Sequence, residues 1–419
     1  MKTTSRPKPH YAWLIFVSCC MIQGGVVGLI QNSCGIFYQP ICRELGFRLS
    51  SVALYTSLRG LAGCLLLPVS TYLIRKRNLR VLLSGAVLCF ALSNFLMGTF
   101  TQLWQWYLAA VTQGIASSFL VFVTTPILLG NWFRKYLGFS IGLSSAFSGI
   151  FGMMANPLGS WIIENFGWRA AYFALSVLCA ALVLPFMLFV IRKTPEELGL
   201  TRLGEGESAP LPGASPEAET EAQGLHLSPV LCLAVVLFLV LTSMITMGFT
   251  QILPSFGESR GLSPAAAAML VSLSMLGNTV GKFSMGAESD RFGVLRVAVV
   301  AFLLPLLGFV LMLFGNPAVY AAAFLSGMSM PAAMVVMPIL IRDFYGSLRY
   351  ERVYAFSSLV GNVAWAMSGT LFGFVAERSG SYRPDIWFCI AILSGAVGIL
   401  FLLVHGAHKS RSPRGKKGA

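Results

Sequence analysis

The chain has 419 residues, of which 56% are hydrophobic and only 11% are charged. Water-soluble globular domains are about a quarter charged, so this composition excludes a soluble enzyme as well as a disordered chain or a disulfide scaffold. It predicts a protein that crosses a membrane many times. The formal charge of +14 then indicates basic cytoplasmic loops rather than nucleic-acid binding.

Twelve apolar segments are long enough to cross a membrane as helices, which takes about 20 residues each. In the first half of the chain they are residues 11–38, 51–74, 81–100, 103–130, 137–163 and 169–191. In the second half they are residues 230–256, 264–287, 294–314, 317–341, 351–376 and 384–405. The sequence therefore predicts an all-α membrane protein with two groups of six transmembrane helices.

Residues 194–228, between the two groups, have a different composition from the rest of the chain. They are rich in Glu and Pro, and such a composition buries too little apolar surface to order itself. We predict a flexible cytoplasmic linker there. The predicted domains are an N-terminal six-helix bundle (residues 1–193), this linker (residues 194–228), and a C-terminal six-helix bundle with a basic tail (residues 229–419).

The Lys and Arg residues orient the predicted helices. With the N-terminus in the cytoplasm, 22 of the 30 lie in inner segments and six lie in outer loops. Cytoplasmic loops carry such an excess of Lys and Arg, so both termini are predicted to be cytoplasmic. The predicted location is the plasma membrane, the cytoplasmic membrane in a prokaryote. The two remaining cations, Arg59 and Lys282, fit no loop.

The two halves carry weak signs of a repeat. Leu-Arg-Val at residues 79–81 recurs at 295–297, and an aromatic–Arg pair at 168–169 recurs at 382–383. The two offsets are nearly equal, which fits two parallel bundles. Transporters are often built from such repeats, with the substrate site near the middle of the membrane between them.

The segment from Gly281 to Gly293 reads Gly-Lys-Phe-Ser-Met-Gly-Ala-Glu-Ser-Asp-Arg-Phe-Gly and resembles the helix 8–9 signature of the major facilitator superfamily. With twelve spans and a hydrophilic central loop, the resemblance covers essentially the whole chain. It implies a two-bundle fold, usually monomeric, that works by alternating access. In that family the Asp-Arg pair of the motif locks the inward-closed state, which implies gating roles for Asp290 and Arg291. The first-half copy at residues 74–77 has no acid at the corresponding place.

Three further segments are similar to the monocarboxylate transporter and oxalate–formate antiporter group of that superfamily. One is Asn-Trp-Phe-Arg-Lys at residues 131–135, followed by a Gly-rich helix and by Gly-Trp-Arg at 167–169. The others are Asn-Ser-Cys-Gly-Ile-Phe-Tyr at 32–38 and Ser-Gly-Ser-Tyr at 379–382. The resemblance implies transport of small organic anions.

Arg59 and Lys282 are the candidate substrate-binding cations. An ionisable side chain in the bilayer core costs several kcal/mol and marks a function. Each lies eight residues from a helix end, at Ser51 or Asp290, which is about 12 Å along a helix in an apolar core about 30 Å thick. No helix centre supplies a matching acid, so the expected counter-ion is an anionic substrate. The resemblance adds that monocarboxylate carriers have a substrate-binding arginine at the position of Lys282.

Each of these cations also has a structural alternative. Lys282 can belong to the gate and reach Glu288 or a carbonyl, and Arg59 can cap carbonyls or pair across helices. Polar residues at a similar depth can complete the substrate cavity or instead form interhelical hydrogen bonds. They are Gln31, Asn32, Gln113, Gln251, Asn278, Asn362 and Trp365.

The function predicted from the sequence is secondary active transport of a small organic anion, as a proton symporter or an anion exchanger. In the first case Lys282 gains a proton as the anion binds; in the second, anions exchange without net proton movement. An exporter of drugs or sugars and a transporter-like sensor are the alternatives. The sequence contains no nucleotide-binding loop or catalytic motif, so no enzyme activity, cofactor or metal is predicted. The expected partners are the anion, protons in the symport case and membrane lipids, without nucleic acid.

Overall fold

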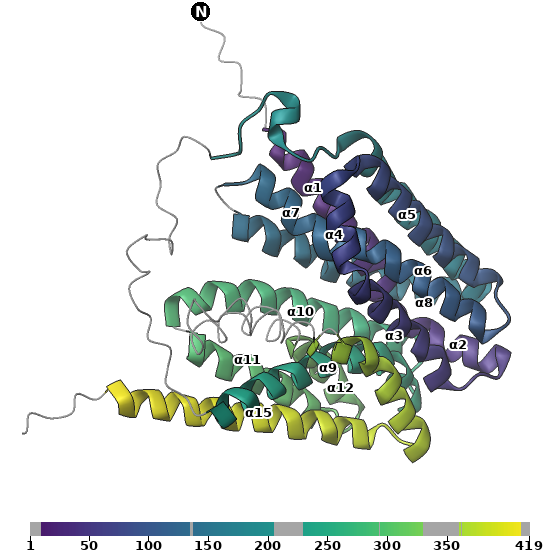
Figure 1. Ribbon diagram of the computed structural model, residues 1–419. Coiled ribbons are helices and arrows are strands. Elements are labelled where there is room, and N and C mark those ends of the chain that lie inside the picture. Colours follow the sequence, from purple (N-terminus) through teal and green to yellow (C-terminus); the bar gives the residue numbers. More distant parts are fainter. Residues whose placement is uncertain are drawn as a thin grey trace, which may run out of the picture. The chain divides into compact units, whose positions relative to one another are not determined.

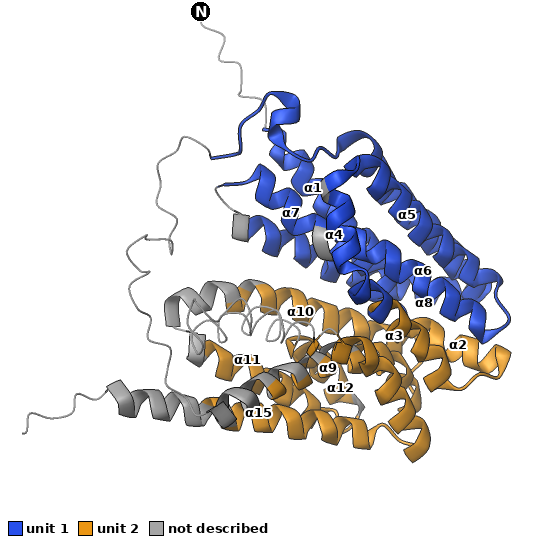
Figure 2. Cartoon of the chain, in the orientation of Figure 1, with its two compact units in different colours: residues 1–34, 61–215 blue, residues 35–60, 216–419 orange. Residues whose placement is uncertain are grey.

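The computed structural model of the protein describes residues 10–134, 137–204, 229–292, 294–329, 360–361 and 363–411. Within these residues the chain is helical apart from turns and an isolated β-bridge between Phe133 and Leu203 (Figure 1). The chain forms two compact units (Figure 2). Unit 1 contains residues 1–34 and 61–215, and unit 2 contains residues 35–60 and 216–419. This division groups residues by how they pack, whereas the two predicted bundles are consecutive parts of the chain, residues 1–193 and 229–419. The bundles therefore remain a prediction.

Unit 1 is built from α-helices. Three of them, α1, α6 and α8, continue at their C-terminal ends into the π-helical segments η1, η3 and η4. Its elements are α1 (Ala12–Ile22), η1 (Gln23–Gln31), α4 (Leu67–Lys76), α5 (Leu79–Leu96), η2 (Met97–Thr99), α6 (Leu103–Ser117), η3 (Ser118–Val123), α7 (Thr124–Trp132), α8 (Leu137–Pro185), η4 (Phe186–Val190) and η5 (Pro195–Leu198).

The 49 residues of α8 are two helices joined at Gly167. A straight helix of that length would be about 74 Å long, more than twice the apolar thickness of a membrane. Gly167 interrupts it with φ 85° and ψ 161°, a left-handed conformation that glycine adopts without strain. Directly after the break, Trp168 is buried with its ring centroid 6.1 Å from that of Trp106. The break falls between the predicted spans 137–163 and 169–191.

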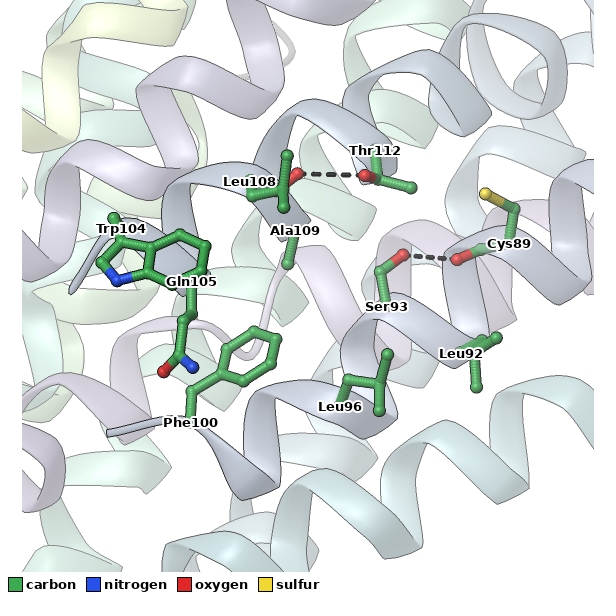
Figure 3. A pocket seen from close by; sticks show the side chains of 10 residues that line it. All are labelled: Cys89, Leu92, Ser93, Leu96, Phe100, Trp104, Gln105, Leu108, Ala109 and Thr112. Atoms are coloured by element: carbon green, nitrogen blue, oxygen red, sulfur yellow. Dashed lines mark hydrogen bonds between the residues drawn. The ribbon is translucent and has the colours of Figure 1, made fainter. Parts of the chain in front are cut away.

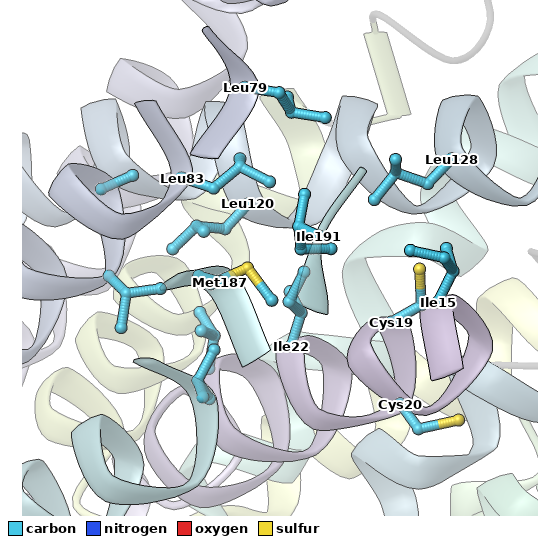
Figure 4. Close-up of a cluster of buried hydrophobic side chains, with 14 of the residues drawn as sticks. Ile15, Cys19, Cys20, Ile22, Leu79, Leu83, Leu120, Leu128, Met187 and Ile191 are labelled. Atoms are coloured by element: carbon cyan, nitrogen blue, oxygen red, sulfur yellow. The ribbon is translucent and has the colours of Figure 1, made fainter. Parts of the chain in front are cut away.

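The hydrophobic core of unit 1 is formed by side chains from α1, η1, α4, α5, α6, η3, α7, α8 and η4 (Figure 4). Ile15 and Cys19 of α1 and Met187 of η4 are fully buried there. Inside a membrane, close van der Waals packing rather than removal of water holds such helices together. The core therefore depends on small residues that let the helices approach.

Gly24 and Gly28 allow η1 to lie directly on α8. A Cβ atom on Gly28 would lie 2.6 Å from the Cβ of Phe151 and 2.9 Å from the carbonyl oxygen of Ser148. A Cβ atom on Gly24 would lie 2.8 Å from the Phe151 ring. Because neither position has room for a side chain, the glycines set the distance between these helices.

The start of the predicted linker is ordered against unit 1. The amide of Asn131 donates to the carbonyl of Lys193 at 3.1 Å, and the indole of Trp132 donates to the carbonyl of Arg192 at 3.0 Å. The Leu203 amide donates to the carbonyl of Trp132 at 2.9 Å. The Asn-Trp-Phe-Arg segment at residues 131–134 therefore binds the chain that follows η4, at Arg192, Lys193 and Leu203. Residues 205–228 lie outside the described residues.

Unit 2 contains the second half of the chain together with residues 35–60. Its elements are α2 (Gly35–Leu45), α3 (Leu49–Leu65, through residue 60), α9 (Pro229–Ser259), α10 (Pro264–Phe292), α11 (Val294–Leu311), α12 (Asn316–Gly327), a helix at residues 363–379, and α15 (Arg383–Arg411). α15 packs against α9 and α11, and α2 packs against α9.

Several of the described helices are long and apolar enough to cross a membrane. Five single runs qualify, and a sixth does if α3 and α4, bent by 51° at their junction, are taken as one span. The 52-residue run Phe139–Val190 is among the five and contains the break at Gly167. The helical fold predicted from the sequence is therefore confirmed among the described residues. The number of twelve spans and the cytoplasmic termini remain predictions.

We expect Gly28→Ala to destabilise unit 1 by about 1–3 kcal/mol, the usual cost of overpacking a filled interior. Gly142→Ala in α8 is the matched control, because no atom lies within 4 Å of its added Cβ. Thermal unfolding of both variants in detergent, followed by size-exclusion chromatography, measures the effect. Equal melting temperatures for the two variants would contradict the tight contact between η1 and α8.

Candidate functional site

The predicted site residues are divided between the two units. Unit 1 holds Gln31, Asn32 and Gln113, and unit 2 holds Arg59, Gln251, Asn278, Lys282 and Trp365. Asn362 lies outside the described residues. Asp290 and Arg291 lie in the last turn of α10, and their side chains are outside the described part of the structure. Their gating roles therefore remain predictions.

In unit 1 the predicted polar residues form hydrogen bonds between helices. The Gln31 amide donates to the Ser117 hydroxyl at 3.1 Å, and the Asn32 amide donates to the Ser148 carbonyl at 3.1 Å. Gln113 is fully buried, with its amide 3.5 Å from the Asn94 side-chain oxygen. These bonds fit the alternative that the polar residues join helices by hydrogen bonds. Substrate binding by these residues remains a prediction.

Gln251 is the centre of a hydrogen-bond network in unit 2. Its side-chain oxygen accepts hydrogen bonds from the Tyr38 hydroxyl and the Thr56 hydroxyl, each at 3.1 Å. A Cβ atom on Gly369 would lie 2.3 Å from the same oxygen, so a side chain there would displace the Gln251 amide from this position. Through this one amide, α2, α3 and the helix at 363–379 all meet α9.

Arg59 is buried beside the helix that carries Trp365. It is 4% exposed, and its guanidinium carbon lies 5.8 Å from the centre of the Tyr55 ring, one turn earlier in α3. On the neighbouring Gly60, a Cβ atom would lie 3.4 Å from the Trp365 ring. The Trp365 indole N–H is buried and has no hydrogen-bond partner among the described residues. A buried donor without a partner costs about 1–3 kcal/mol, and an acceptor on a ligand would recover that cost.

Lys282 lies in α10 and is partly buried. Among the side chains that the structure describes, none forms a hydrogen bond or an ion pair with its ammonium group. Asn278 lies one turn earlier and is 1% exposed. A partly buried cation that no described acid neutralises is what an anion-binding position requires.

A cavity of about 340 Å³ lies elsewhere, between α5 and α6 of unit 1 (Figure 3). Its wall is mostly apolar and includes Leu92, Phe100 and Trp104. The hydroxyls of Ser93 and Thr112 donate to carbonyls of their own helices. None of the residues that line it is charged, so this cavity does not suit a small anion.

Asp385 is a buried acid that the sequence analysis did not identify. It lies in the first turn of α15 and is 1% exposed. An Asp in a first helical turn next to Arg383 and Pro384 is typical of a solvated helix start, so nothing in the local sequence distinguishes it. Burial by neighbouring helices is visible only in the tertiary structure.

Comparison with known proteins identifies the class to which this helical, two-unit structure belongs. The chain matches the Major Facilitator Superfamily over residues 20–270 and 235–419. The protein is therefore a member of the major facilitator superfamily, an integral membrane transporter and not an enzyme, as the sequence analysis predicted.

Similar sequences come from the monocarboxylate transporter group. Monocarboxylate transporter 13 of Rattus norvegicus is 24% identical over 417 residues, which cover 96% of this chain and 91% of the relative. Monocarboxylate transporter 3 of Mus musculus is 28% identical over 169 residues, or 40% of this chain and 34% of the relative. The resemblance to this group, stated on the sequence motifs, is confirmed.

Solved structures share the fold. Two crystal structures of the nucleoside transporter NupG align over 94% of this chain and 99% and 97% of theirs, with TM-scores of 0.71 and 0.64 and identities of 13% and 14%. A bacterial homologue of the human lysosomal transporter Spinster aligns over 96% of both chains with a TM-score of 0.59. At such identities the similarity concerns the fold alone.

We expect a non-additive effect when both hydroxyl donors to Gln251 are removed. Tyr38→Phe or Thr56→Val alone leaves one donor on the amide oxygen and costs about 1 kcal/mol, whereas the double variant leaves a buried carbonyl unpaired at a cost of about 1–3 kcal/mol more. Thermal unfolding of the two single variants and the double variant measures the coupling. Strictly additive shifts in melting temperature would show that the hydroxyls of Tyr38 and Thr56 do not act on the same oxygen of Gln251, which would contradict the network.

Proposed function

We propose that the protein is a secondary active transporter of a small organic anion, a monocarboxylate or a small dicarboxylate, in the plasma membrane. The observation that carries this proposal is Lys282, a partly buried cation that no described side chain neutralises. An ammonium group inside a membrane protein requires a counter-ion, and a carboxylate substrate supplies one.

The surroundings of Arg59 support the same class of substrate. A guanidinium group offers two parallel donors that match a carboxylate. Trp365 adds a buried N–H with no partner among the described residues, close to the backbone of Gly60. The full-length similarity to monocarboxylate transporter 13 of Rattus norvegicus points to the same chemistry.

The proposed mechanism is alternating access between two six-helix bundles of a monomer. The twelve spans follow from the apolar segments, and the cytoplasmic termini follow from the distribution of Lys and Arg. The binding site lies near the middle of the membrane, and Asp290 and Arg291 gate its cytoplasmic side. The transported anion moves either with a proton or in exchange for another anion.

Counterflow in reconstituted vesicles tests the substrate class. Vesicles preloaded with unlabelled lactate, formate or oxalate are offered the same labelled anion, with a sugar and a nucleoside as neutral comparisons. We expect at least one anion to exchange and the neutral compounds not to. Exchange of the sugar or nucleoside alone would contradict the proposal and favour a transporter of neutral solutes, and binding without exchange would favour a sensor.

Replacing Lys282 separates its charge from its contribution to packing. Lys282→Gln removes a charge-assisted hydrogen bond worth about 1.5–3 kcal/mol, so anion affinity should fall by about 10- to 100-fold. Lys282→Arg keeps the charge and should retain exchange. Lys76→Gln, on the exposed face of α4, is the control and should behave as the wild type. If Lys282→Gln bound the anion with unchanged affinity, Lys282 would not be a substrate-binding residue.

The same arginine variant tests whether Lys282 carries the proton. Arginine does not release its proton in proteins, so a lysine-based symporter should lose the pH dependence of anion uptake in Lys282→Arg. Uptake rates measured across a series of external pH values decide the point. Full retention of the pH dependence in this variant would assign the proton to another group or exclude proton coupling through Lys282.

A further inference from the structure

Asp385 is a buried carboxyl group that plays no part in the substrate site proposed above. It is 1% exposed, and its Oδ2 atom has no hydrogen-bond partner among the described residues. Neither of the ion pairs in the described part of the chain involves it. A buried carboxylate without a cation or donor costs far more free energy than the neutral acid. Asp385 therefore has the lower free energy in this buried position when its carboxyl group carries a proton.

Two groups of its own segment interact electrostatically with Asp385, and one of them, Tyr382, also interacts with two other helices. The two groups are Tyr382 and Cys389, and Tyr382 also interacts with Glu258 of α9 and Cys42 of α2. Burial raises the pKa of Tyr382 to about 12, so its phenol stays neutral at physiological pH. Tyr382 therefore interacts with two carboxyl groups, those of Asp385 and Glu258, and no ion pair between described residues involves Asp385.

The described side chains of the adjacent helix α11 offer Asp385 no cation either. Its described side chains, Val297 to Leu311, are not titratable. Arg260, which follows α9, donates to the carbonyl of Met312 at the end of α11 and lies 5.4 Å from the centre of the Phe256 ring. Arg43 forms an ion pair with Glu258.

Two ion pairs join residues 35–60 to the second half of the chain within unit 2. Arg43 pairs with Glu258, and Arg48 pairs with Glu377. Glu377 also accepts a hydrogen bond from the Ser50 hydroxyl at 2.7 Å, which together with Arg48 lowers its pKa. The Glu258 side chain is 14% exposed, and its burial raises its pKa although Arg43 opposes that shift. In the predicted topology these contacts lie at the outer ends of the helices.

We propose that Asp385 is the proton-binding residue of this transporter and that its protonation stabilises the contacts between residues 35–60 and the second half of the chain. A proton from the external water binds Oδ2 and converts the carboxylate to the carboxylic acid, with no other bond changed. Tyr382 interacts with both Asp385 and Glu258, so ionised Asp385 would place a second negative charge around Tyr382 in apolar surroundings, which favours entry of water and separation of these contacts. Lower external pH therefore favours the closed outer contacts seen here.

Infrared spectroscopy tests the protonation without any substrate. The C=O stretching band of a protonated carboxylic acid is recorded on the reconstituted protein over a pH series, for the wild type and for Asp385→Asn. We expect a band that weakens as pH rises and that is missing in Asp385→Asn. Glu164→Gln, an exposed acid in α8, is the control and should leave the band unchanged. An identical band series in the wild type and Asp385→Asn would overturn the proposal.

Transport measurements test the coupling, and this part rests on the proposed function. With one proton per anion, a gradient of one pH unit drives about a tenfold accumulation of lactate or formate. We expect Asp385→Asn to lose this accumulation, to keep counterflow, and to melt no lower than the wild type, because the amide removes a buried charge. A merely structural role would lower the melting temperature and leave accumulation intact, which would overturn the proposal. If the wild type moves no anion, the proposed function fails while the infrared result still decides whether Asp385 binds a proton.

Discussion

The free energy of placing a charge in an apolar interior constrains this protein more than any other interaction. In a chain with so few charged residues, each buried ionisable group must have a counter-ion, a set of hydrogen bonds or a proton. The buried and partly buried groups of unit 2 differ in which of these they have. Glu258 has Arg43 as its counter-ion, Lys282 has no described counter-ion, and Asp385 has an oxygen without a hydrogen-bond partner.

These differences assign anion binding to Lys282 and proton binding to Asp385 in the two proposals. A cation that lacks a protein acid suits an anionic ligand, because the ligand brings the missing charge and can leave with it. An acid that lacks a protein cation suits a proton, which adds no volume and needs no space in a packed interior. The two proposals concern different helices, α10 and the start of α15, and protonation of Asp385 can be measured without any substrate.

Close packing supplies the rigid framework in which such charges are placed. Gly28 lets η1 lie on α8, and Gly369 lets the helix at 363–379 reach the side chain of Gln251. Neither contact can be deduced from a glycine in an apolar sequence, because Gly142 lies in a similar context and faces open space. The amide of Gln251 then orders Tyr38 and Thr56 by hydrogen bonds.

The sequence by itself determined the class of protein, because apolar length, scarce charge and the Gly281–Gly293 motif are local properties that survive without a structure. It also predicted the break near Gly167 and the cationic character of Arg59 and Lys282. Only the tertiary structure decided that the Asn131–Arg134 segment binds the start of the linker, that residues 35–60 pack with the second half of the chain, and that Asp385 is buried. Burial and pairing depend on residues far apart in the chain, so a helix-end aspartate in solvent and one inside the protein have the same local sequence.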